Sequence, residues 1–383
     1  MPGFELLDEK ELDAVRDVLQ KGKLFRYGYG KNNNNSFSAR FERRIAKILN
    51  VPFVHAVSSG TAAVRVAIEF LDLQPGDEVI TTCFTFVATV EAIIEAGGVP
   101  VIVDIDRTYN MSPAALEQAI NEKTRAVVVV HMLGAQARMN EIMAIAKKHN
   151  LPVIEDTAQA FGAKLGRQFL GTFGDVGTFS FDFGKTITTG EGGAVVTKDE
   201  KIFNRMHQYA DHGHVHDFSL QRGMEPHYVR GFNYRIGEIN SAIGLVQLEK
   251  YKQHASTMKA IKKKLKDKTA AAGSFEFREI LDPEHELSDT LVTICKNKKQ
   301  AMVINSKIEN AGFMSKILPE AMRWHFAAHW DHLIARLPYY KGKDPKKMWT
   351  QSAELLERSV SVGIRYKITD EQIDRIANCF RPL

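Results

Sequence analysis

Short apolar runs alternate with amphipathic segments over the first half of the chain, and this alternation constrains the fold more than any other sequence feature. The apolar runs have the length of strands and lie at residues 53–57, 78–82, 100–105, 126–130, 152–155, 175–181 and 193–197. The segments between the first five of these runs have helical spacing and lie at residues 61–71, 86–96, 112–121 and 138–149. Because the strand-length runs are apolar on both faces, they predict a mostly parallel central sheet flanked by helices.

The chain is too long for one hydrophobic core. It has 383 residues, and single cores rarely grow beyond roughly 250–300 residues. A long amphipathic stretch at residues 237–268 leads into a region that is richer in lysine and tryptophan. We therefore predict a large α/β domain over residues 1–255 and a smaller C-terminal α+β domain over residues 256–383. The N-terminal helix expected at residues 8–21 is a candidate to pack on the small domain.

Charge and cysteine content exclude several classes of protein. A formal charge of +5 from 51 basic and 46 acidic residues allows an anionic small-molecule partner but does not call for nucleic acid or a membrane. The three cysteines lie far apart without CxxC spacing, which favours neither a disulfide framework nor a metal site. The chain lacks an apolar window of about 18 residues and a signal peptide. We expect a soluble cytoplasmic protein without a metal.

The segment Ser-Ser-Gly-Thr-Ala-Ala at residues 58–63 follows an expected strand and opens an expected helix. At such a junction the first backbone N–H groups and the positive end of the helix dipole face outward together, which suits a phosphate. Gly60 lets an anion approach the backbone closely, and Thr61 follows it. Taken alone, the segment is more typical of an ordinary helix start with a Ser or Thr cap.

Two further residues follow strand ends, where ligands bind in α/β sheets. Phe86 comes just after the strand at 78–82 and could lie flat against a heteroaromatic ring, although a core phenylalanine is the alternative. Asp156 directly follows the strand at 152–155, and Glu155 beside it points to the opposite side. A carboxylate at this place can keep a pyridine nitrogen protonated, and a helix-capping aspartate is the alternative.

Lys185 lies between the apolar strand at 175–181 and a Thr/Gly-rich turn, with few charges nearby. A lysine in such surroundings loses proton affinity and can act as a nucleophile and then as a base. Ser180 on the same strand could add a hydroxyl to the phosphate site, and Gln159 could reach a ring hydroxyl. Pyridoxal 5'-phosphate requires four features of a protein, which are a lysine for an imine, an acid for a pyridine nitrogen, a phosphate-binding segment and a flat side chain over the ring. The sequence has a candidate for each.

With these residues in place, the sequence resembles the nucleotide-sugar aminotransferase family of fold-type I pyridoxal phosphate enzymes, the DegT/DnrJ/StrS group. The matching segments are SSGTAAV (58–64), TFVATVEAI (85–93), PVIEDTAQAFGA (152–163), GDVGTFSF (174–181), GKTITTGEGGAVVT (184–197) and GFNYRIGEINSAIGLVQLEK (231–250). They span most of the large domain in the order of the family.

The resemblance implies that Lys185 forms the imine with the cofactor and that Asp156 pairs with the pyridinium. The other implied cofactor contacts are Phe86 on the ring, Gln159 at the ring oxygen, and Gly60, Thr61 and Ser180 at the phosphate. Asn233, in the Asn-Tyr-Arg motif, matches a residue that family members lend to the neighbouring subunit's phosphate site. The resemblance therefore implies a homodimer with shared active sites.

Three departures from the family pattern concern the sugar pocket. They are Asp182-Phe183-Gly184 before the lysine, residues 361–366 in place of a proline-containing motif, and the loop at 23–36. With L-glutamate as donor, the resemblance implies 3,8-dideoxy-8-oxo-D-manno-octulosonate as acceptor, giving the 8-amino sugar for lipopolysaccharide. A nucleotide-linked keto-6-deoxyhexose is the alternative. An acidic acceptor would need an arginine, and the candidates, each of which could instead be structural, are Arg26, Arg230 and Arg235.

Two other functions compete with transamination. Related sugar dehydratases carry histidine where the lysine stands, so Lys185 argues against dehydration. Regulators that bind the cofactor without turnover usually append a DNA-binding module, for which this length leaves no room. The alternating His212, His214 and His216 could place three imidazoles on one side of an extended segment. We expect a polar loop near the active-site mouth there rather than a metal site.

Overall fold

The computed structural model describes residues 3–273, 275–315, 318–319 and 322–381. Its centre is a seven-stranded sheet with the order β1-β9-β8-β5-β4-β2-β3. The strands are β1 (Phe53–Val57), β2 (Glu78–Thr82), β3 (Val99–Val103), β4 (Thr124–Val130), β5 (Val153–Asp156), β8 (Val176–Ser180) and β9 (Gly193–Thr197). Strands β3, β2, β4, β5 and β8 pair in parallel, and β9 is antiparallel to both its neighbours. The predicted mostly parallel sheet is therefore confirmed.

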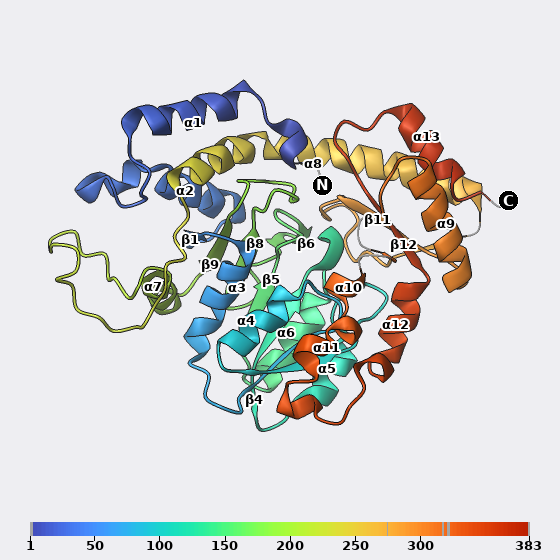
Figure 1. The fold of residues 1–383 in the computed structure, drawn as a ribbon, viewed down its shortest axis with the longest axis horizontal. Helices are drawn as coiled ribbons and strands as arrows, with labels where there is room; N and C mark the ends of the chain where they lie inside the picture. Colours follow the sequence, from blue (N-terminus) through green and yellow to red (C-terminus); the bar gives the residue numbers. More distant parts are fainter. Residues whose placement is uncertain (1–2, 274, 316–317, 320–321, 382–383) are drawn as a thin grey trace.

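Helices flank this sheet, as Figure 1 shows. They are α2 (Phe37–Leu49), α3 (Gly60–Ile68), α4 (Ala88–Glu95), α5 (Pro113–Ala119), α6 (Met139–Lys148) and α7 (Glu200–Tyr209). In β4, Val127, Val128 and Val129 are all 0% exposed. A strand that is covered on both faces needs apolar residues at successive positions, which explains why its sequence does not alternate.

The helix α1 (Glu9–Lys21) packs along α8 (Glu238–Ala272) at the top of Figure 1. A capping box at Asp8 starts α1, and Gly22 in the left-handed conformation ends it. Lys250 of α8 donates to both carboxylate oxygens of Glu11 at 2.7 Å. Since α8 runs without interruption through residue 255, the division of the chain at that residue stays a prediction.

A second, antiparallel sheet consists of β10 (Glu276–Phe277), β11 (Thr290–Ile294) and β12 (Ser359–Gly363). The helices of this part of the chain are α9 (Lys298–Asn310), α12 (Thr350–Glu357) and α13 (Asp370–Asn378), with the shorter α10 (Met322–His325) and α11 (Asp331–Ile334). Strands β6 (Lys164–Leu165) and β7 (Gln168–Phe169) form a separate two-stranded sheet. The 3-10 helices lie at Gly3–Leu6, Gly30–Asn35, Glu69–Leu71, Met132–Gly134, Ala327–His329, Pro338–Tyr340 and Pro345–Lys347. Within the described ranges, no helix combines the length and the hydropathy needed to cross a membrane.

The C-terminal part of the chain returns to the large sheet. The N–H of Thr85 donates to His325 O at 3.0 Å, and the N–H of Ala327 donates to Cys83 O at 2.9 Å. Further along, the Trp349 indole N–H donates to Ile102 O at 2.8 Å. These bonds hold residues from α10 onward against the ends of β2 and β3, so His325 lies next to the segment that carries Phe86.

Candidate active site

A cavity of about 350 Å³ lies where the carboxyl ends of β5 and β8 meet the start of α3. It is lined by all the predicted site residues except Asn233, namely Gly60, Thr61, Phe86, Asp156, Gln159, Ser180 and Lys185. Ligands of open α/β sheets bind at this edge. The structure thus brings together residues that lie more than a hundred positions apart in the sequence.

The start of α3 forms an anion-binding corner of the cavity. Ser59 is the N-cap, and its hydroxyl accepts the N–H of Ala62 at 3.0 Å. The N–H groups of Gly60 and Thr61 belong to the first turn, which has no intrahelical acceptors, at the positive end of the helix dipole. A Cβ on Gly60 would lie 2.7 Å from Ser180 Cβ and 2.9 Å from its Oγ. Only glycine lets α3 approach the Ser180 hydroxyl this closely.

Asp156 ends β5 and is 6% exposed. Its Oδ2 accepts a hydrogen bond from Thr89 Oγ1 at 2.8 Å, and its Oδ1 accepts the N–H of Ala158 at 3.2 Å. Glu155 turns to the other side of the strand, as predicted. There its Oε2 lies 3.0 Å from His131 Nε2, and backbone N–H groups of the loop at 171–174 donate to both its oxygens. One carboxylate faces the cavity and the other anchors the sheet.

Lys185 lies on the turn that follows β8. Its backbone N–H donates to Asp182 O at 2.9 Å, and the carboxylate of Asp182 accepts the N–H of Gly184 at 2.9 Å. The N–H of Gly3 donates to Lys185 O at 3.1 Å, and a Cβ on Gly3 would meet that oxygen at 2.4 Å. The N-terminal 3-10 helix therefore covers the lysine turn tightly. Lys185 also borders a smaller hollow whose lining includes Asp289.

Phe86 stands at the mouth of the cavity with 41% of its surface exposed. Its ring is parallel to that of Trp324, with an interplanar angle of 4° and 6.2 Å between centroids. His325 also lines the cavity. Phe86 is thus not a core side chain, and the alternative interpretation of this position is wrong.

Gln159 is buried beside Met132 and Leu133. Its Oε1 accepts the N–H of Leu133 at 3.1 Å, and its Nε2 lies 3.7 Å from Met132 Sδ. Thioether sulfur is a weak acceptor, so the Gln159 amide can donate to a stronger acceptor in the cavity.

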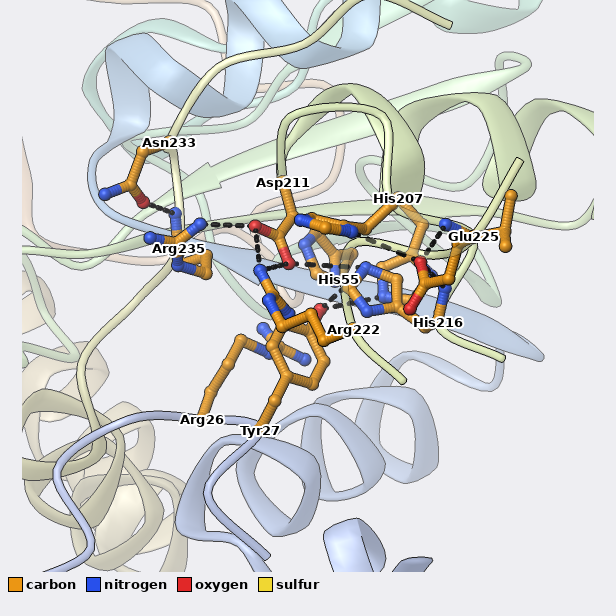
Figure 2. Close-up of polar contacts among 12 residues, drawn as sticks. Arg26, Tyr27, His55, His207, Asp211, His216, Arg222, Glu225, Asn233 and Arg235 are labelled. Atoms are coloured by element: carbon orange, nitrogen blue, oxygen red, sulfur yellow. Dashed lines mark hydrogen bonds and ion pairs between the residues drawn. The ribbon is translucent and has the colours of Figure 1, made fainter. Parts of the chain in front are cut away.

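Asn233 is exposed and does not line the cavity of its own chain. It lies at the base of the loop between α7 and α8, where Asn233 and Asp211 pair as an antiparallel bridge. The N–H of Arg235 donates to Asn233 Oδ1 at 3.3 Å (Figure 2). The contact expected with a neighbouring subunit stays a prediction.

The alternating histidines do not lie along an extended segment. His212 and His216 have φ of 53° and 59°; His212 is exposed, whereas the ring centroids of His214 and His216 lie 6.1 Å apart. His216 Nε2 lies 3.2 Å from the hydroxyl of Tyr27, and His214 Nδ1 lies 3.2 Å from a carboxylate oxygen of Glu225. In the part of the chain that the structure describes, no three His, Cys, Asp or Glu side chains are arranged to hold a metal ion.

A buried cluster around His216 was not expected from the sequence (Figure 2). His207 Nε2 lies 3.1 Å from the Tyr27 hydroxyl, and the rings of His207 and His216 stack with centroids 4.2 Å apart. Burial lowers the pKa of His207 well below its ordinary value, and it lowers the pKa of His216 to about 3. Both imidazoles are therefore neutral near pH 7.

The three arginines proposed for an acidic acceptor have different surroundings. Arg26 is 3% exposed and donates to Glu42 Oε1 at 2.8 Å and to Ala56 O at 3.0 Å, so it is structural. Arg235 donates to Asp211. Arg230 is exposed.

The cavity also contains residues to which the sequence assigned no role, among them Thr89, Glu191 and His325, and it contains Asp182 from the segment expected at the sugar pocket. Thr89 follows Phe86 by three positions in an expected helix, so the helical spacing could have identified it. His325 had no local signal, because it reaches the site through the return of the C-terminal segment.

Comparisons with known proteins show the family and the fold. The model of the DegT/DnrJ/EryC1/StrS aminotransferase family matches residues 5–381. A GDP-perosamine synthase of Escherichia coli O157:H7 is 42% identical over 219 residues, which are 57% of this chain and 59% of that protein. A GDP-perosamine synthase of Caulobacter vibrioides is 36% identical over 274 residues, 70% of this chain and 69% of that protein. The matched segments thus cover only part of these relatives. The structure of an aminotransferase from Psychrobacter cryohalolentis superposes with a TM-score of 0.84 and 26% identity, covering 97% of this chain and 96% of that one.

Proposed function

Because the chain belongs to the DegT/DnrJ/EryC1/StrS aminotransferase family, we propose that it is a pyridoxal 5'-phosphate-dependent sugar aminotransferase. The observation that carries the proposal is that Lys185, Asp156 and the start of α3 all line one cavity. A buried acid, a lysine and a phosphate corner in one cavity have few other uses.

The residues fit this cofactor. The start of α3 and the Ser180 hydroxyl suit a phosphate, and both line the cavity where Gly60 packs closely on Ser180. A volume of about 350 Å³ lies in the usual range for small-molecule sites, roughly 300–1,000 Å³. When bound, the cofactor supplies an aldehyde that links amines covalently and a ring that accepts electrons from the substrate carbon.

The side chains around the cavity then have distinct roles. Asp156 would hold a proton at the ring nitrogen, and its own position is fixed by Thr89 and by the N–H of Ala158. Lys185 would carry the cofactor through Nζ and, once released, would move a proton from the substrate carbon. Phe86 would lie against the ring, and Gln159 would donate its amide to the ring oxygen.

Asn233 would complete the phosphate site of an adjacent copy of the chain. Its side chain is exposed and lies outside its own cavity. The same loop exposes large apolar side chains, which are Phe218, Leu220, Met224, Tyr228 and Phe232. Exposed apolar surface of this kind is typical of an interface. We therefore propose a homodimer with shared active sites.

For the substrates, we propose L-glutamate as donor and a keto or aldehydo sugar as acceptor. Two relatives are named for a GDP-linked sugar, which favours a nucleotide-linked acceptor over a free one. The 8-oxo-octulosonate acceptor stays a prediction, as does the choice of arginine for its carboxylate.

The test is a pair of half-reactions with the protein loaded with pyridoxal 5'-phosphate. We expect L-glutamate to yield one equivalent of 2-oxoglutarate per site and to bleach the yellow colour. Nucleotide-linked keto sugars and 8-oxo-octulosonate are then offered in parallel, and amine formation is followed by mass spectrometry. A protein that binds the cofactor but releases no oxo acid from any amino acid is not an aminotransferase.

A further inference from the structure

The loop between α7 and α8 extends from the body of the protein, at the left of Figure 1. Backbone pairing closes this loop at its base. Asp211 and Asn233 face each other there as an antiparallel bridge. On either side of this bridge, His212 N–H donates to Phe232 O at 3.1 Å and Tyr234 N–H donates to Ala210 O at 3.0 Å. The backbone of Asn233 is thus fixed by the chain around Asp211.

The carboxylate of Asp211 holds two segments of this loop together (Figure 2). It is 0% exposed, and both its oxygens lie 3.0 Å from Nη2 of Arg222. Oδ1 also accepts a hydrogen bond from Arg235 Nη1. Burial by itself would raise the pKa of Asp211, but the two guanidinium groups hold that pKa below its ordinary value. The carboxylate is therefore ionised and can hold both arginines at neutral pH.

Arg235 connects this ion pair to Asn233. While its guanidinium is held by Asp211, its backbone N–H donates to Asn233 Oδ1 at 3.3 Å. A carboxamide has one acceptor end and one donor end. Because the acceptor end bonds back to Arg235, the Asn233 NH₂ group is the end left for an outside partner. A phosphate accepts hydrogen bonds, so it can bond to the Asn233 NH₂ group in this orientation of the carboxamide.

The other side of Asp211 contacts the buried cluster. His216 Nε2 lies 3.5 Å from Asp211 Oδ2, and the Tyr27 hydroxyl lies 3.2 Å from the same histidine nitrogen. The aspartate is thus held against the body of the protein by Tyr27 and His216 and against the loop by the arginines.

We propose that Asp211 is a positioning residue for Asn233: through Arg235 it fixes the asparagine amide so that its NH₂ group meets the cofactor phosphate of the adjacent subunit. This inference rests on the proposed function, because it takes the phosphate of that cofactor as the partner of Asn233.

The experiment is a double-mutant cycle on cofactor affinity. Apo-protein is titrated with pyridoxal 5'-phosphate, and the dissociation constant is measured for the wild type, for Asp211→Asn, for Asn233→Ala and for the double variant. We expect Asn233→Ala to weaken binding about tenfold, as for one hydrogen bond to a charged group. Asp211→Asn should weaken it severalfold. The double variant should match Asn233→Ala, because Asp211 acts only through Asn233.

A matched control separates positioning from general loss of stability. Glu286→Gln breaks a buried ion pair with Lys262 in the region of the small sheet, where Nζ and Oε2 lie 2.5 Å apart. This variant should lower the melting temperature and leave the dissociation constant unchanged. If Asp211→Asn does not fold, Arg235→Gln replaces it in the cycle, since Arg235 is the link to Asn233.

Equal affinity of Asp211→Asn and wild type would overturn the inference while leaving the proposed function intact. A loss in the double variant equal to the product of the two single losses would also overturn it. A wild-type protein that does not bind the cofactor at all would instead refute the proposed function, and the inference with it.

Discussion

Acidification should destabilise this protein through His216, and the size of the effect follows from its burial. The side chain is 6% exposed. Burial lowers its pKa in the folded protein to about 3, against the attraction of Asp211, whereas the ordinary value is 6.5. The folded state thus disfavours the proton. The stability that depends on neutral His216 is complete above pH 6.5 and is lost as the pH falls from 6.5 towards 3.

The full pKa difference corresponds to about 5 kcal/mol in the free energy of unfolding, of which about 2 kcal/mol is lost between pH 7.5 and pH 5.0. Urea unfolding at these two pH values measures the difference directly. We expect the wild type to lose about 2 kcal/mol more than His216→Gln over this interval. The comparison uses the change with pH, so a constant cost of the substitution cancels.

His212→Gln is the matched control, because His212 is exposed on the same loop. It should show the pH dependence of the wild type. If His216→Gln loses as much stability as the wild type between pH 7.5 and pH 5.0, the burial argument for the histidine cluster is wrong.

Three further predictions concern the cavity. Replacing Lys185 with Ala should reduce turnover at least about 10³-fold, since a general base is lost together with the covalent link, and steady-state assays of amine formation measure this. Thr89→Val removes a hydrogen bond from buried Asp156 and should cost about 1–3 kcal/mol in the free energy of unfolding, measured by urea titration; an unchanged midpoint contradicts the role given to Thr89. Gly60→Ala places a methyl group 2.7 Å from Ser180 Cβ, so we expect weaker binding of pyridoxal 5'-phosphate in an apo-protein titration, and an unaltered dissociation constant argues against the phosphate corner.

Much of the seven-stranded sheet could be predicted from sequence because its signals are local. Buried parallel strands are short runs of apolar residues, and β1, β2 and β9 have the predicted bounds. Asp156 and Ser180, which are predicted to contact the cofactor, lie at the ends of such strands, so a correct strand assignment also places them at the same edge of the sheet.

The features that the sequence does not indicate depend on long-range contacts. His325 reaches the cavity, and Trp324 reaches the Phe86 ring, because hydrogen bonds hold their segment against Cys83 and Thr85; no periodicity encodes such a return. The histidine cluster was missed for a related reason. His216 contacts Tyr27 and His207, which come from other segments of the chain, and no local pattern encodes such contacts.

The central claim is that Lys185 carries the cofactor. The most direct measurement is borohydride reduction of the protein loaded with pyridoxal 5'-phosphate, followed by proteolysis and mass spectrometry of the labelled peptide. We predict one stable adduct, on the peptide that contains Lys185. An adduct on another lysine, or none in a protein that retains its native fold, would contradict this assignment and the activity proposed from it.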